Sequence, residues 1–197
     1  INRSGTVAGN LGEVTETGYF SGFRIPNGVM TVTDAHRLSP AGTFSQADAI
    51  NDLDQVVGAS GGLGKNEGAV ALSSSLFLSP TSIIDPYLTR EIYCINNHGV
   101  VGGLFADPSD PFFGAGFLIN LGQNIVIPDN VPVFRDTTLI PFSINNSGIT
   151  VGSGSSPVAL VKDYSGIWDL SVLTDESRGQ LGFREAYKIN DAGQILI

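Results

Sequence analysis

The segment INNSGITVG, residues 144–152, is one of five near-copies of a single nine-residue motif in this chain. The other four copies, INRSGTVAG, INDLDQVVG, INNHGVVGG and INDAGQILI, start at Ile1, Ile50, Ile95 and Ile189. Successive copies therefore start 49, 45, 49 and 45 residues apart. A motif that recurs at a near-constant interval of this length indicates a tandem-repeat protein.

Each copy of the motif predicts the turn of a β-hairpin. Asn follows the first Ile, and the fifth position is Gly in four copies and Asp54 in the remaining one. Asn and Asp bind their own backbone in turns, and Gly accepts the positive φ that closes a turn. The apolar runs that end at each later Ile predict the incoming strands, and these are QADAI, REIYCI, LIPFSI and REAYKI.

Further apolar segments follow each hairpin. Phe23, Leu72 and Phe117 lie 22 residues after the first Ile of their units, and Leu160 lies 16 residues after it. We expect these residues to mark one strand and the later runs VMTVT, IIDP, NIVIP and WDLSVL to mark another. Each unit of about 47 residues would then hold about four short strands, which is the size of one propeller blade.

The sequence therefore predicts an all-β fold, a β-propeller or part of one, in a single repeat domain spanning residues 1–197. The predicted repeats are 1–49, 50–94, 95–143 and 144–188, with a partial fifth at 189–197. A β-sandwich gives no reason for a recurrent Ile-Asn motif, and a parallel β-helix needs shorter coils. Because the first unit lacks an incoming strand and the fifth is short, we also expect further repeats, a second chain or the opposite end of this chain to cover the unpaired edge.

Composition narrows the classes of partner. The chain has 10 Lys and Arg against 19 Asp and Glu, so its net charge of −9 opposes nucleic acid and acidic membranes. No apolar run approaches the ~18 residues that a membrane-spanning helix needs. The single cysteine, Cys94, lies among apolar neighbours and is predicted to be a buried thiol.

The motif resembles the HAF family of extracellular repeats. AINDLDQVVGAS and KINDAGQILI are similar to the hairpin element of that family, and AGFLINLG and SGFRIPNG are looser matches to its second strand. The His of the family's triplet is replaced by Ser21, Val70, Ala115 and Val158, and its Trp by Ile25 or Ile119. The resemblance implies a bacterial secreted or cell-surface location and a propeller-like fold, and it implies no catalytic residues.

Several residues carry a chemical signal that a structural role explains better. Residues 58–62, GASGG, fit the nucleophile-elbow pattern, but no helix pattern follows them. Residues 61–65, GGLGK, lack the Ser or Thr that a phosphate-binding loop needs after Lys. His36 and His98 have no partners at metal-ligand or general-base spacing.

Certain carboxylates, aromatic residues and glycosylation sequons also have both a functional and a structural interpretation. Asp52 with Asp54, and Asp107 with Asp110, offer oxygen ligands to calcium, although Asp is also common in turns. Trp168, Tyr164, Tyr87 and Tyr19 could stack on sugars, although strand aromatics are more often core residues. The sequons at Asn2 and Asn145 fall in the predicted turns. We therefore predict no catalytic residue, no metal site and no cofactor.

Two functions fit these features. The first is a non-enzymatic extracellular binding or assembly module for a protein or a glycan, because the recurrent positions are Asn, Gly and apolar residues. The second is a propeller-type polysaccharide hydrolase or lyase that gathers carboxylates from different blades near the axis. A cleft with two carboxylates and an aromatic residue would favour the second.

Overall fold

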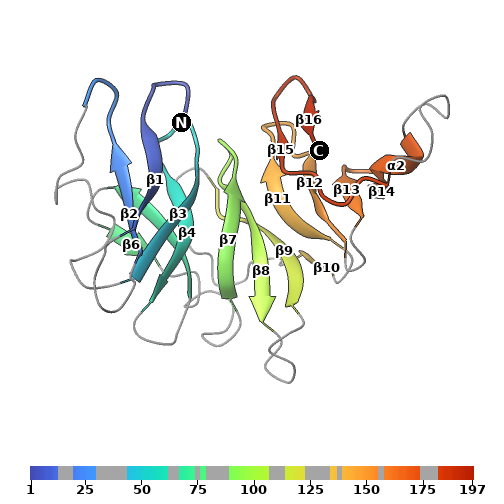
Figure 1. Ribbon diagram of the computed structural model, residues 1–197, viewed down its shortest axis with the longest axis horizontal. Coiled ribbons are helices and arrows are strands. Elements are labelled where there is room, and N and C mark those ends of the chain that lie inside the picture. The colour runs from blue at the N-terminus through green and yellow to red at the C-terminus, as the bar shows by residue number, and fades with distance from the viewer. Residues whose placement is uncertain are drawn as a thin grey trace.

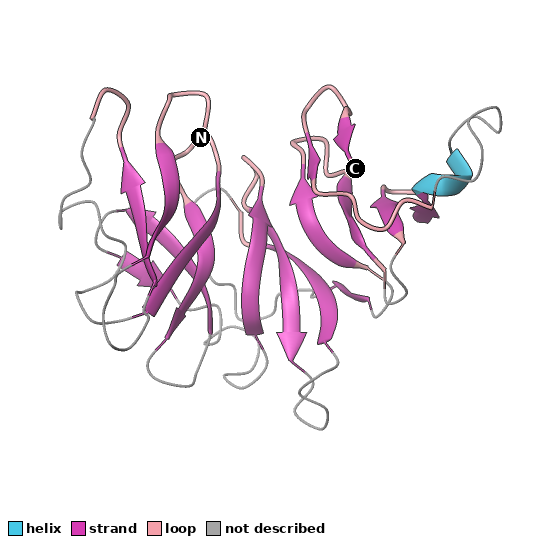
Figure 2. Ribbon diagram, in the orientation of Figure 1, coloured by secondary structure: helices cyan, strands magenta, loops and turns pink. Residues whose placement is uncertain are grey.

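A computed structural model of the chain describes most of its strands and the turns between them. The described residues are 1–12, 20–29, 44–61, 67–73, 76–78, 89–106, 114–122, 134–136, 139–154, 158–173 and 182–197. They form several small antiparallel sheets that stand side by side (Figure 1), and strands dominate the secondary structure (Figure 2). This confirms the mostly β prediction.

Three of the sheets have four strands each. The first has the order β3 (Phe44–Ile50), β4 (Val56–Gly61), β5 (Glu67–Ser73) and β6 (Leu76–Leu78). The second has the order β7 (Thr89–Ile95), β8 (Val100–Ala106), β9 (Gly114–Asn120) and β10 (Phe134–Asp136). The third has the order β11 (Ile140–Ile144), β12 (Thr150–Ser153), β13 (Ala159–Lys162) and β14 (Ile167–Asp169). The strand before each Ile-Asn turn is therefore an edge strand of its sheet.

Two-stranded sheets lie at the two ends of the row. β1 (Val7–Gly12) pairs with β2 (Phe20–Ile25), and β15 (Lys188–Ile189) pairs with β16 (Ile195–Leu196). Within the described residues, β1 pairs only with β2 and β16 pairs only with β15, and the sheets close into neither a barrel nor a ring. How the outer edges are covered stays a prediction.

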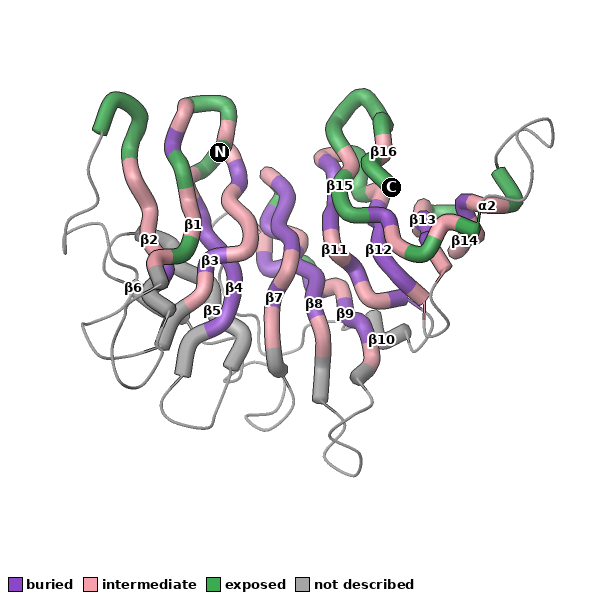
Figure 3. Tube along the Cα trace, viewed as in Figure 1, coloured by how far each residue is buried: buried purple, intermediate pink, exposed green. Residues whose placement is uncertain are grey.

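The core lies between the sheets and within them. Val56, Val57 and Ala59 of β4 are almost fully buried although they point to both faces, and all four residues of β12 are buried. Figure 3 shows these buried segments in β4 and β12. Because a strand that is buried on both faces needs apolar cover on each side, neighbouring sheets stabilise one another.

The glycine at the ninth position of the motif has a packing role. A Cβ added at Gly58, Gly103 or Gly152 would collide with the carbonyl oxygen of Gln46, Glu91 or Ile140, respectively. Each of those carbonyls belongs to the strand that pairs with the strand of the glycine. The recurrent glycine therefore allows the two strands of the hairpin to approach closely.

The turn and strand predictions are mostly confirmed. Phe23, Leu72, Phe117 and Leu160 lie in β2, β5, β9 and β13, and the first three incoming runs lie in β3, β7 and β11. In the fourth incoming run only Lys188 and Ile189 form a strand. IIDP, NIVIP and most of VMTVT lie outside the described residues.

The prediction that WDLSVL is a strand is wrong for its last four residues. The run starts in β14 and continues as helix α2 (Leu170–Leu173). Asp169 precedes the helix, and its Oδ1 accepts hydrogen bonds from the backbone N–H of Ser171 at 2.7 Å and from the Ser171 hydroxyl at 2.6 Å. An Asp in this N-cap position favours a helical turn over further strand.

Candidate binding site

The five Ile-Asn turns share one local geometry. In the second turn, Asn51 Oδ1 accepts hydrogen bonds from the backbone N–H of Leu53 and of Gln55, both at 3.0 Å. The fifth position of every turn has a positive φ, which is 61° at Asp54 and between 76° and 84° at the glycines Gly5, Gly99, Gly148 and Gly193. The predicted left-handed turn residues are confirmed, and Asp54 is one of the few residue types that tolerate this conformation.

The Asn side chains also join each turn to the next. Nδ2 of Asn2, Asn51, Asn96 and Asn145 donates to the backbone carbonyl of the next motif Asn, at 2.9, 3.0, 3.1 and 3.3 Å in that order. We call these four bonds, together with the five turns that they connect, the turn ladder. Because Asn51, Asn96 and Asn145 are each only 4% exposed, most of the ladder is protected from water.

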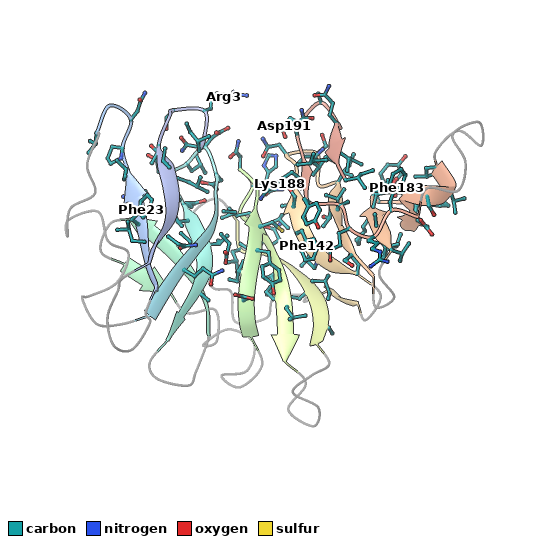
Figure 4. All side chains as sticks on the ribbon, viewed as in Figure 1. Arg3, Phe23, Phe142, Phe183, Lys188 and Asp191 are labelled. Carbon is teal, nitrogen blue, oxygen red and sulfur yellow. The ribbon has the colours of Figure 1, made fainter. Side chains whose placement is uncertain are left out.

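A second line of hydrogen bonds follows the third residue of each turn. The backbone N–H groups of Arg3, Asp52, Asn97 and Asn146 donate to Oδ1 of the corresponding side chain in the next turn, at 2.8 to 2.9 Å. Figure 4 shows Arg3 and Asp191, the two ends of this line, on the same upper side of the molecule. The turns thus fix the spacing of the sheets.

The carboxylates of Asp52 and Asp54 form hydrogen bonds within the turn ladder. Asp52 accepts hydrogen bonds from the Arg3 backbone N–H at 2.8 Å and from Asn97 Nδ2 at 2.9 Å, and these bonds lower the pKa of Asp52. Asp54 Oδ1 accepts a hydrogen bond from Asn2 Nδ2 at 2.6 Å. Among the described residues, no group of three or more His, Cys, Asp or Glu side chains is placed to hold a metal ion.

The three edge strands β3, β7 and β11 each carry a β-bulge at the same place before the turn. The pairing register shifts between Ala47 and Ala49 in β3, between Ile92 and Cys94 in β7, and between Pro141 and Ser143 in β11. The bulged residues are Asp48, Tyr93 and Phe142. A bulge turns a side chain away from the regular alternation of the strand and is frequent next to functional sites.

The edge strands frame a cavity of about 350 Å³. Its walls are the first-position Ile of all five motif copies and the residue before it in the last four, together with Ala8 and Asp48. The polar groups of this wall are Asp48, Cys94, Ser143 and Lys188. We call this space the inner cavity.

Asp48 supplies the carboxylate of the inner cavity. Its Oδ1 accepts a hydrogen bond from Gln46 Nε2 at 2.7 Å, whereas its buried Oδ2 has no hydrogen-bond partner among the described residues. Burial raises the pKa of Asp48 to about 6, the Gln46 bond opposes this rise, and the negative charge of Glu91 adds to it. A dry, unpaired carboxylate oxygen is costly and is therefore a candidate ligand contact.

Lys188 supplies the positive charge of the cavity. Lys188 is exposed, and the charge of its ammonium group lowers the pKa of Asp48. Figure 4 shows its side chain close to β7 and β11. The Asp48 carboxylate, an acceptor, and the Lys188 ammonium, a donor, therefore belong to the same cavity although the two residues are 140 positions apart in the sequence.

Cys94 and Ser143 are the neutral polar residues of the wall. Burial raises the pKa of the Cys94 thiol to about 12 although the Lys188 charge opposes this rise, so the thiol stays protonated and weakly nucleophilic. The Ser143 hydroxyl accepts a hydrogen bond from the Ile189 backbone N–H at 3.2 Å. Among the described residues, the hydrogen bonds of Cys94 and Ser143 join them to backbone groups and not to a base that would activate a nucleophile.

In the later motif copies, aromatic residues occupy the position that Asp48 has before the second copy. The rings of Tyr93 and Phe142 meet edge to face at 5.9 Å, and those of Phe142 and Tyr187 are stacked at 6.4 Å. The Tyr93 hydroxyl donates to Glu91 at 2.7 Å, and the Tyr187 hydroxyl is bonded to Glu185. Because Tyr187 is 50% exposed, its ring remains open to a ligand. We call these three residues the aromatic row.

The structure places the other predicted candidates apart from the inner cavity. Gly58, Ala59 and Ser60 lie inside β4, which pairs on both sides, so this segment is no nucleophile elbow. His98 is an exposed turn residue, and the two sequon residues Asn2 and Asn145 belong to the turn ladder. Trp168 and Tyr164 are exposed near the β13–β14 turn. His36, Tyr19, Tyr87, Asp107, Asp110 and residues 62–65 lie outside the described residues.

Sequence reasoning missed the inner cavity, although one signal was present. The residues that precede the first-position Ile of the later motif copies are Ala49, Cys94, Ser143 and Lys188. Comparing this position between copies would have revealed a single Lys in an otherwise uncharged place, and Asp48 stands out in the same way one residue earlier.

Comparison with protein-family models, with curated proteins and with solved structures gives no match for this chain. The resemblance to the HAF family therefore stays a prediction. No helix of the described part is both long enough and apolar enough to cross a membrane.

Proposed function

We propose that this chain is a non-enzymatic binding module built as a propeller-like tandem repeat, and that its ligand occupies the inner cavity. The single observation that carries this proposal is the buried Asp48 Oδ2, which has no partner among the described residues and lies in the wall of a cavity that the exposed Lys188 also lines. A buried polar group without an internal partner costs free energy, and a ligand that supplies the partner removes this cost.

The repeat architecture is supported by the geometry of the turns. The same hydrogen bonds, the same positive φ and the same bulge recur at corresponding positions of the motif copies. Lateral bonds between successive turns are what a blade array needs in order to place its inner strands around a common axis. In this proposal the module is secreted or displayed at the cell surface, where an acidic, Gly-rich repeat binds a protein or a glycan.

The hydrolase or lyase alternative is less well supported. Glycoside hydrolysis ordinarily needs two carboxyl groups about 5–9.5 Å apart. Of the described residues that line the inner cavity, only Asp48 carries a carboxylate side chain. Glu91 acts on Asp48 through its charge and is bonded to the Tyr93 hydroxyl. The arrangement suits holding a ligand better than cleaving one.

The test is binding to arrays of immobilised glycans and extracellular peptides, comparing the chain with its Ala49→Phe variant. Ala49 lines the cavity, so Phe fills it while every polar group stays in place. Ser147→Phe, at an exposed turn position, is the control. We expect Ala49→Phe to abolish binding and Ser147→Phe to retain it. Unchanged binding by Ala49→Phe, or no binding by the chain, would overturn the proposal, and turnover of a bound glycan would favour the enzyme.

A further inference from the structure

The inner cavity and the aromatic row together point to a ligand class. We infer that the site takes the end of a neutral glycan chain, whose hydroxyl groups bridge Asp48 and Lys188 while a sugar face rests on the Tyr187 ring. This inference rests on the proposed binding function and adds the chemistry of the ligand.

The polar groups of the site fit a ligand that both donates and accepts hydrogen bonds. When Asp48 is ionised, its Oδ2 can only accept a hydrogen bond, and the Lys188 ammonium can only donate one. A hydroxyl group does both, so adjacent hydroxyls on one ring can satisfy the two side chains at once. Such bonds to charged groups are stronger than bonds between neutral groups.

The charge balance favours a neutral ligand. Asp48 and Lys188 carry opposite charges across the cavity, so the site itself is close to neutral. Glu91 lies near enough to raise the pKa of Asp48, and the chain as a whole has a net charge of −9. Anionic ligands are therefore repelled, and a cation has no surplus negative charge inside the cavity to bind.

The aromatic row adds the apolar contact that a sugar ring uses. Phe142 and Tyr187 are stacked with an angle of 14° between their planes, and Tyr187 directly precedes Lys188 in the chain. The Tyr187 hydroxyl is bonded to Glu185. An amphipathic ring of this kind suits a ligand with one apolar face and polar edges. The cavity of about 350 Å³ is small for a ligand pocket and admits a chain end rather than a long segment.

The experiment follows the backbone amide spectrum of the isotope-labelled chain during titration with maltotriose, cellotriose, mannotriose and, as a zwitterionic probe, triglycine. The variants are Asp48→Asn, which replaces the ionised carboxylate by an amide, Lys188→Met, which removes the donor at similar length, and Tyr187→Ala. Tyr164→Ala and Lys162→Met are the matched controls, because these two residues neither line the inner cavity nor belong to the aromatic row. Unchanged spectra away from the substituted residue show that each variant is folded.

We expect at least one trisaccharide to shift the amides around Asp48, Ser143 and Lys188, and each site variant to weaken its binding by about tenfold or more, as loss of a charged hydrogen bond predicts. The two controls should bind as the parent chain does. Binding of triglycine alone at these residues would overturn the glycan inference and leave the binding function standing. Binding of a trisaccharide without dependence on Asp48 and Lys188 would overturn the inference and the location of the site. Shifts with none of the probes would overturn the glycan inference alone, since the array test decides the binding function.

Discussion

Asp48 lowers the stability of the fold and, in the proposed function, also contacts the ligand. Asp48 lies at the β-bulge of an edge strand. One of its carboxylate oxygens is bonded to Gln46, and the other is buried without a hydrogen-bond partner among the described residues. An unpaired buried acceptor destabilises a fold unless a ligand or a proton satisfies it.

Asp48→Asn should stabilise the chain at high pH and have little effect at low pH. The pKa of Asp48 is about 6 in the folded protein against an ordinary 3.8, so the fold binds this proton more tightly than the unfolded chain does. The resulting destabilisation is absent below pH 3.8 and complete above about pH 6. After allowance for solvent screening of a partly exposed group, we expect the variant to gain about 1–2 kcal/mol in free energy of unfolding at pH 8 and to lose this gain at pH 4. Urea unfolding at both pH values measures this, and an equal difference at both would contradict it.

The Cys94 thiol should react slowly with a thiol reagent such as 5,5′-dithiobis(2-nitrobenzoic acid) at pH 8. The side chain is 3% exposed, and its pKa of about 12 leaves almost no thiolate. Unfolding in urea should restore the rate of an ordinary cysteine. A native rate equal to the unfolded rate would show that Cys94 is neither buried nor protonated.

At the scale of elements, the Ile-Asn turn explains most of what the sequence could predict. Its Asn side chain bonds its own backbone and its fifth residue is left-handed, and both properties follow from residue chemistry within one turn. The run WDLSVL was misjudged because the N-cap at Asp169 competes with strand periodicity over a few residues. The inner cavity could not be located from the sequence, because only the packing of the sheets brings residues such as Asp48 and Lys188 to one cavity.

Gly148→Val should lower the free energy of unfolding by about 1–3 kcal/mol, which is the cost of forcing a β-branched residue into a left-handed conformation. The φ of Gly148 is +81°, and a Cβ there would meet no atom within 4 Å, so the effect is one of backbone conformation alone. Gly148→Asn should cost less, because Asn tolerates this region. Ser147→Val is the control at the adjacent exposed position, and equal thermal midpoints for all three variants would count against the turn geometry.

Asn96→Ala should destabilise the chain by about 2–4 kcal/mol, since it removes three side-chain bonds from a buried site. Those bonds join Asn96 to His98 and Val100 within its own turn and to the Asn145 carbonyl in the next. Asn190→Ala is the matched control, because Asn190 is exposed and its side-chain bonds are to Gln194 of the same turn. Chemical unfolding should show a clearly smaller loss for the control. Equal losses would mean that the turn ladder adds nothing to stability.

At the scale of the whole molecule, the turn ladder makes the sheets into one row. Each turn is bonded to the next through buried Asn side chains, and each sheet places its edge strand on the inner cavity. Local stability is therefore coupled to the shape of the binding site, since loosening one turn would shift two strands of the cavity wall.

The most direct test of this account is a carboxyl carbon titration of Asp48 by NMR in the parent chain and in Lys188→Met. Asp48 lies in β3 and Lys188 in β15, so either residue can sense the other only if their sheets share one cavity. The account predicts a midpoint near pH 6 in the parent chain and a higher midpoint in the variant, because the neighbouring positive charge is lost. A midpoint near the ordinary value of 3.8 that Lys188→Met leaves unchanged would contradict the inner cavity and the function proposed for it.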